Sequence, residues 1–192
     1  MSLLNEYYSV ILSNPALKSV VFVIISIIAA KLVDIIFTFI FKRLVDKTKT
    51  SLDDKILQLL HKPIFYSILF IGFSIAVKTA ALPAYIDFVI VGIFKTITII
   101  IWLFVSSKIL VMSMEWASRQ TASTLLQKNT LPLFNNLGKI AIGLFGVYLV
   151  FLSWDINING ILASAGVLGV VLGLAAKDTV ANFFAGIFLM AD

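Results

Sequence analysis

Few side chains in this sequence could do chemistry, and the most unusual of them are two charges inside an apolar run. Lys31 and Asp34 stand three residues apart in a segment that is otherwise almost entirely hydrophobic. On a helix this spacing places both side chains on one face. Ionisable groups at such positions form ion paths or pairs. The two residues could therefore belong to an ion path, or they could satisfy each other at a contact between helices.

Residue types that serve enzymes are scarce. The chain has one histidine, His61, and no cysteine, so a histidine or thiolate metal site and a thiol nucleophile are not expected. The carboxylates of Asp53 and Asp54 are adjacent in sequence, which on a helix points them about 100° apart. Metalloprotease, hydrolase and phosphate-loop motifs are also missing from the sequence. We expect no catalytic residue, no metal and no cofactor.

Small residues recur at helical spacing near the C-terminal end of the sequence. They are Ala163, Gly166, Gly169, Gly173 and Ala176. Steps of three and four place them in one stripe on a helix. Lipid does not drive helices together as water does, so membrane helices associate where small residues let their backbones approach closely. We predict that this small-residue stripe is a helix packing surface.

A second stripe lies beside the first and is apolar. Val167, Val170 and Leu174 follow one another at steps of three and four, and Lys177 continues the line. Helices ringed by copies of themselves would point these aliphatic residues at a narrow, dry axis, and such a constriction gates a pore by dewetting. The same spacing also fits a tightly packed helix of a single-chain bundle without a pore. The two stripes alone leave both interpretations open.

The elements that carry these residues are predicted to be five membrane helices. Hydrophobic residues make up 60% of the 192 positions and charged residues only 13%, against about 25% charged in soluble domains. The apolar runs cover residues 19–41, 63–80, 86–111, 133–152 and 156–191. Helix is the expected structure, since strands in lipid need a closed barrel. The sequence therefore indicates an all-α membrane protein.

The fifth run is too long for one straight span. As a single helix it would measure about 54 Å, beyond a hydrocarbon core of about 30 Å. We expect a bend at Lys177 and Asp178, with Asp178 capping a second helix that lies along the membrane interface. Gly186 is a further candidate bend.

Basic residues predict the orientation in the membrane. Most of them flank or fill the first and third connections: Lys42, Arg43, Lys47, Lys49, Lys55, Lys62, Lys108, Arg119 and Lys128. Connections rich in Lys and Arg stay in the cytoplasm. We therefore expect the N-terminus outside and the end of the fifth run inside.

The run from Gly166 to Gly186 resembles the pore helix of the small-conductance mechanosensitive channel family. The matching pattern is Gly-x-x-Gly-x-x-x-Gly-Leu-Ala-Ala-Lys-Asp-Thr-x-x-Asn-Phe-Phe-Ala-Gly. By resemblance, Val170 and Leu174 match the family's pore-closing rings, and the glycine stripe matches its packed face. Lys177-Asp178 and Gly186 match its bends. Lys177 would then place a ring of positive charge at the inner mouth.

The resemblance also implies a function and a domain plan. Family members are homoheptamers that open under bilayer tension and release ions and small solutes on osmotic downshock. We therefore expect this chain in a bacterial inner membrane. Residues 1–18 would be a lead, 19–155 a tension-sensing paddle of four helices, and 156–192 the pore helix and an interface helix. The family's cytoplasmic domain is expected to lie outside these 192 residues. A small secondary transporter and a non-conducting scaffold subunit are the alternatives.

Overall fold

The computed structural model describes residues 14–45, 51–120 and 130–191, and the regular structure in these ranges is entirely α-helical. Its helices are α2 (Pro15–Val45), α3 (Ser51–Thr79), α4 (Ala84–Gln120), α5 (Leu131–Ser153) and α6 (Asn159–Ala191). All five are long and apolar enough to cross a membrane. The predicted all-α membrane fold with five spanning helices is confirmed.

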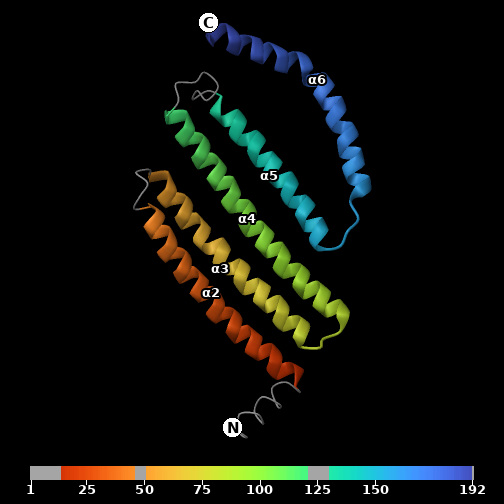
Figure 1. The fold of residues 1–192 in the computed structure, drawn as a ribbon. Helices are drawn as coiled ribbons and strands as arrows, with labels where there is room; N and C mark the ends of the chain where they lie inside the picture. Colours follow the sequence, from red (N-terminus) through yellow and green to blue (C-terminus); the bar gives the residue numbers. More distant parts are fainter. Residues whose placement is uncertain (1–13, 46–50, 121–129, 192) are drawn as a thin grey trace. The chain divides into compact units, whose positions relative to one another are not determined.

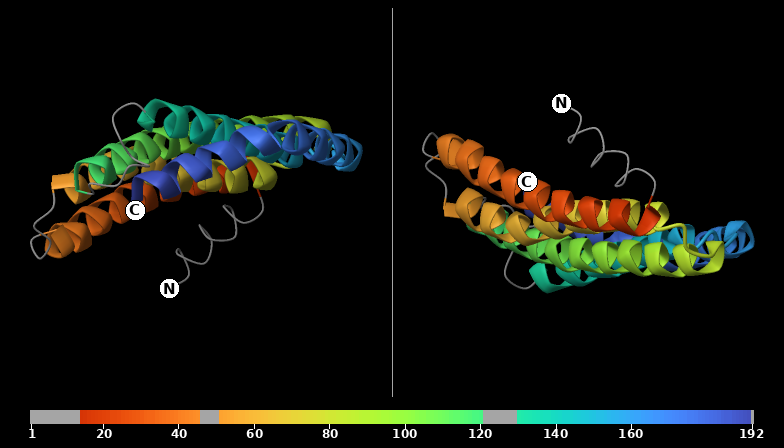
Figure 2. Two further views of the ribbon diagram at one scale, coloured as in Figure 1. Left: turned by 90° about the horizontal axis from the view of Figure 1, so that it is seen from above. Right: turned by 90° about the horizontal axis from the view of Figure 1, so that it is seen from below.

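The chain divides into two compact units, Met1–Ile109 and Leu110–Asp192. The first, which we call the N-terminal unit, holds α2, α3 and most of α4. Within this unit, each helix lies beside the next one along the chain and runs antiparallel to it (Figures 1 and 2). The second, the C-terminal unit, holds the end of α4 together with α5 and α6.

Asparagine side chains explain where two of the helices, α2 and α6, begin. The Asn14 side-chain oxygen accepts the backbone N–H of Ala16 at 3.0 Å, and Pro15 takes the first helical position of α2. Asn157 does the same before α6, accepting the N–H of Asn159 at 3.0 Å. Both asparagines satisfy one of the N–H groups that a helix start leaves without a partner.

Each of the two short turns that the structure describes contains one residue with a left-handed backbone conformation. Ala81, between α3 and α4, and Asp155, between α5 and α6, both have φ of 52°. Aspartate tolerates this conformation better than most residues, whereas alanine carries a steric penalty. The two turns agree with the chain breaks that the sequence predicts near Pro83 and before Gly160.

The prediction that the second span begins at Pro63 is wrong. α3 begins at Ser51 and passes through Pro63, whose side chain is fully buried. Proline is tolerated inside membrane helices because neighbouring helices and local adjustments satisfy the freed backbone groups. The helix therefore includes much of what the sequence assigns to a connection.

Small residues bring α2 and α3 into close contact. Ser26 and Ala30 of α2 are buried, as is Ala76 of α3. A Cβ atom built on Gly72 of α3 would collide with the Ser26 side chain and lie 3.2 Å from its Cα. Glycine at this position is therefore required by the approach of the two backbones, as at other membrane helix contacts.

Aromatic residues join α3 to α4 within the N-terminal unit. The rings of Phe70 and Phe94 stack with centroids 5.4 Å apart, and Phe73 also contacts Phe94. Trp102 of α4 donates its ring N–H to the Ser67 hydroxyl of α3 at 2.9 Å. These contacts set the antiparallel register of the pair.

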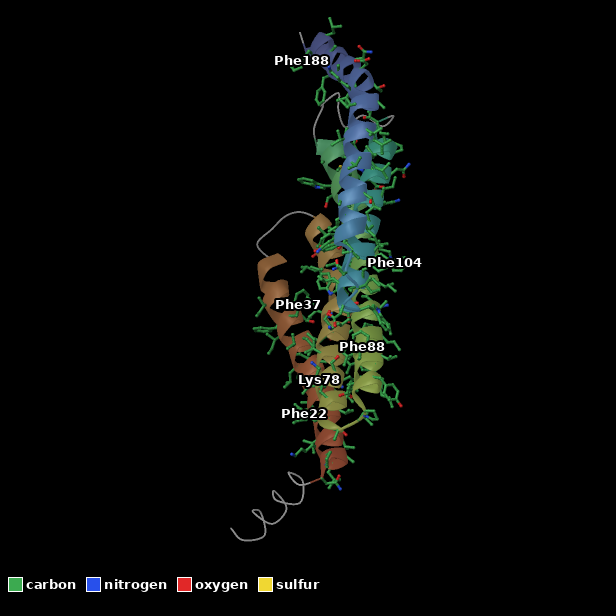
Figure 3. The ribbon with its side chains drawn as sticks, turned by 90° about the vertical axis from the view of Figure 1, so that its right-hand side faces the viewer. Phe22, Phe37, Lys78, Phe88, Phe104 and Phe188 are labelled. Carbon is green, nitrogen blue, oxygen red and sulfur yellow. The ribbon has the colours of Figure 1, made fainter. Side chains whose placement is uncertain are left out.

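Large apolar side chains project outward along the helices. Phe104 of α4 and Phe188 of α6 are 67% and 72% exposed (Figure 3). Soluble monomers rarely expose extended apolar surface, whereas lipid solvates it. The chain is thus a multi-pass membrane protein.

Candidate functional site

The candidate site is α6, which carries both stripes found in the sequence. Asn159–Ala191 is one continuous helix of 33 residues. The prediction of two separate helices, with Asp178 as a cap, therefore differs from the structure. Asp178 and Thr179 lie inside the helix, where their backbone groups already have helical partners, so no cap is needed. Figure 1 shows that α6 nevertheless changes direction along its length.

The apolar stripe of α6 is open. Val170 is 64% exposed and Leu174 is 69% exposed, and Val167 is similarly accessible. Lys177 and Asp178 are exposed one turn further on. The structure thus places these residues on an exposed surface of α6.

The small-residue stripe is equally open. Cβ atoms built on Gly166, Gly169 and Gly173 would meet nothing within 4 Å, and the same holds for Gly186. Ala163 and Ala176 are exposed. Gly72 differs, because there the neighbouring helix fills the space in front of the glycine.

The difference between Gly72 and the α6 glycines is relevant to the second interpretation of the spacing, in which α6 is a packed helix of a single-chain bundle. A bundle helix uses its glycines against a neighbour in the same chain, as Gly72 does against Ser26 and as Gly138 of α5 does against Leu110. The α6 glycines have no such neighbour among the described residues of the C-terminal unit. Glycine costs helix stability of roughly 1 kcal/mol relative to alanine, so a repeated glycine stripe needs a packing partner, and another chain can supply it.

The possible pair of Lys31 with Asp34 is not formed in the structure. Asp34 Oδ1 instead lies 2.5 Å from Nδ1 of His61, on α3. His61 Nε2 lies 2.8 Å from the Thr38 hydroxyl oxygen, on α2. Lys31 is exposed, and in the described ranges its ammonium group forms no ion pair.

Sequence reasoning overlooked His61 as the partner, although one signal was available. Ser26, Ala30, Asp34 and Thr38 recur every four residues and so form one small and polar row on α2. Such a row faces another helix rather than lipid. Within the described ranges, no three His, Cys, Asp or Glu side chains group to hold a metal ion.

The comparisons with known proteins point to one family. Residues 136–177 match the family model described as "Mechanosensitive ion channel, transmembrane helices 2/3". This stretch covers most of α5 and the first half of α6. It includes the glycine stripe from Ala163 to Ala176 and ends at Lys177.

Three curated proteins are similar to the chain. The small-conductance mechanosensitive channel MscMJ of Methanocaldococcus jannaschii is 29% identical over 188 residues, 95% of this chain and 54% of that protein. An uncharacterized MscS family protein of Aquifex aeolicus is 24% identical over 177 residues, 87% of this chain and 45% of its own length. The uncharacterized MscS family protein YhdY of Bacillus subtilis is 33% identical over 61 residues, 32% of this chain and 16% of its own.

The chain matches only part of each relative. The chain spans about half the length of the first two proteins. No solved structure matches the chain.

Proposed function

Because this chain is an MscS-like family member, we propose that several copies of it surround a pore that membrane tension opens. The observation that carries this proposal is the open surface of α6. Its small-residue stripe and its apolar stripe are both exposed, as expected of a helix that packs against copies of itself and faces an axis.

In this assembly the two stripes have separate tasks. Ala163, Gly166, Gly169, Gly173 and Ala176 form the contact between neighbouring α6 helices. Val167, Val170 and Leu174 face the axis and close the pore by excluding water. Seven copies, in a bacterial inner membrane, is the arrangement that the family resemblance favours.

The other helices take the part of a tension sensor. If α5 and α6 are the second and third helices of the family model, α4 takes the place of the first, and α2 and α3 are additional. Tension favours the state that interacts better with a stretched bilayer. Tilting of the outer helices would slide one glycine stripe past the next, with bends at Lys177, Asp178 and Gly186. Release of ions and small solutes during osmotic downshock follows.

The proposal is tested by recording from liposome patches that contain the natural full-length protein while suction is stepped. We expect openings whose probability rises with tension, and none in protein-free patches from the same lipid. Silence from patches in which the protein is shown to be inserted and oligomeric would contradict the proposal and favour a scaffold. Saturable solute uptake without openings would favour a transporter.

Lys177 gives a prediction about ion preference. A ring of Lys177 ammonium groups at one mouth attracts anions and repels cations. Replacing Lys177 by Gln should therefore move the reversal potential in a KCl gradient towards less anion preference. Lys139→Gln is the matched control, because Lys139 is exposed on α5 and should leave the reversal potential unchanged. An unaltered reversal potential in Lys177→Gln would remove this role.

A further inference from the structure

A polar cluster joins α2 to α3 within the N-terminal unit. It consists of Asp34 and Thr38 on α2 and of His61 on α3, and we call it the α2–α3 lock. Asp34 and His61 approach within 2.5 Å, and their side chains are only about one-third exposed, at 33% and 34%. The rings of His61 and Phe37 also meet in a T-shaped contact, with centroids 5.7 Å apart.

The hydrogen bonds of the lock depend on the protonation of His61. The Thr38 hydroxyl donates to the Asp34 carbonyl oxygen at 2.8 Å. Its oxygen is then an acceptor towards His61 Nε2, 2.8 Å away, while the Asp34 carboxylate is an acceptor towards Nδ1. Two acceptors facing the two ring nitrogens are fully satisfied by the imidazolium, which donates from both.

Loss of one proton weakens this arrangement. The Thr38 hydroxyl must then turn towards Nε2 and give up its bond to the Asp34 carbonyl, or leave Nε2 unpaired. The bond between Asp34 and His61 also loses one of its two charges, and bonds between two charged groups are the stronger ones. Histidine is the side chain that changes charge in the physiological range of pH. The lock needs a donor on both ring nitrogens, so we expect it to strengthen on acidification.

Other charged groups near His61 leave this reasoning intact. Lys62 follows it on α3, and Lys31 precedes Asp34 on α2; both are exposed. On α4 the register set by Ser67 and Trp102 brings Lys108 near the level of His61, and Lys108 is exposed too. Within the described ranges, none of these three ammonium groups forms an ion pair with Asp34.

The lock continues a close contact that already holds the two helices. Ser26 and Ala30 lie on the same four-residue row as Asp34 and Thr38, and Ser26 meets Gly72 of α3. Packing fixes one point of the pair and the lock fixes a second, towards the ends joined by the basic first connection. Two separated fixed points prevent one helix from sliding or rotating on the other.

We propose that Asp34, Thr38 and His61 form a proton-strengthened lock that makes α2 and α3 one rigid body and thereby sets how much membrane tension reaches the rest of the channel. When α2 and α3 form a rigid pair, sliding of one helix along the other takes up less of a tilt that the membrane applies. Protons on the face of the membrane that bears the basic connection would therefore lower the opening threshold.

The first test measures the lock without any channel recording. Thermal unfolding of the full-length protein in lipid nanodiscs is compared for the natural protein, Asp34→Asn, His61→Gln and the double variant. At about pH 6 we expect the losses of unfolding temperature in the two single variants, added together, to exceed the loss in the double variant by roughly 2–4 °C. This is the shift that one charge-assisted bond produces in a chain of this size. At about pH 8.5 this excess should fall below half.

A matched control separates charge from general packing. Ser67→Ala removes the neutral hydrogen bond from Trp102 between α3 and α4 and should lower the unfolding temperature equally at both pH values. An excess that is absent, or that is the same at both pH values, would overturn the proposal.

The second test rests on the proposed function. In excised patches, acidification to about pH 6 of the face bearing the basic connection should lower the opening threshold of the natural protein and of Ser67→Ala, but not of Asp34→Asn. A threshold shift that persists in Asp34→Asn, or none in the natural protein, would overturn the regulatory role. Silent patches would contradict the proposed channel instead, and the unfolding test would still decide whether the lock exists.

Discussion

Replacing Leu174 by Asn is expected to lower the tension at which the channel opens, and Val170→Ser is expected to do the same. Both side chains are exposed on α6, and the proposed pore turns them towards its axis. An apolar ring keeps such an axis dry, whereas polar side chains allow water to enter. Hydrating one large aliphatic side chain costs about 1.5–3 kcal/mol.

The effect should be large because every subunit contributes to the ring. A relief of about 1.4 kcal/mol already corresponds to a factor of ten in an equilibrium. We therefore expect the open probability at a fixed tension to rise about tenfold or more. Leu168→Asn and Leu172→Asn are matched controls that make the same chemical change on other faces of the helix, each about 160° from Val170. Thresholds that move as much in the controls, or stay unchanged in the ring variants, would count against this gate.

Replacing Gly169 or Gly173 by Leu is expected to disrupt assembly or to raise the opening threshold. In the single chain a Cβ atom at either position meets nothing within 4 Å, and leucine is the better helix former. An isolated α6 would therefore tolerate both changes or gain stability. In the proposed assembly the harm comes from the neighbouring α6 helix, where overfilling a packed contact costs about 1–3 kcal/mol.

This prediction is tested by measuring the mass of the oligomer in detergent and the tension at which the channel opens in patches. Gly143→Leu is the control, since Gly143 lies on α5 with the same open space but outside the small-residue stripe. The control should assemble as the natural protein does. If Gly169→Leu and Gly173→Leu also assemble and open normally, α6 does not pack through its glycines.

The overall fold could be predicted because lipid imposes a simple rule. Apolar runs long enough to span a bilayer become helices, and five such runs are visible in the sequence. The helix ends were harder to predict. Pro63 suggests a boundary when read locally, yet α3 passes through it. Asp178 suggests a new helix, yet α6 continues past it, because strong helix formers such as Leu174 and the neighbouring alanines surround the polar residues.

The partner of Asp34 could not be predicted from spacing along one helix. Lys31 is near in sequence, whereas His61 becomes near only when α2 and α3 pack antiparallel in one register. That register depends on the contact of Ser26 with Gly72, which is a property of two helices together. The stripes of α6 were visible in the sequence, but spacing along one helix does not say what they pack against, and we propose that it is another copy of the chain.

Thiol labelling tests the central claim, that α6 lines a pore closed at Val170 and Leu174, most directly. These 192 residues contain no cysteine, so within them single cysteines can be introduced without altering other positions. A bulky charged thiol reagent is added to liposome patches during suction, and the current through Val170→Cys, Leu174→Cys, Leu168→Cys and Leu172→Cys channels is followed. We predict tension-dependent block at positions 170 and 174 and none at 168 and 172. Equal block at all four positions, or block confined to 168 and 172, would contradict the account.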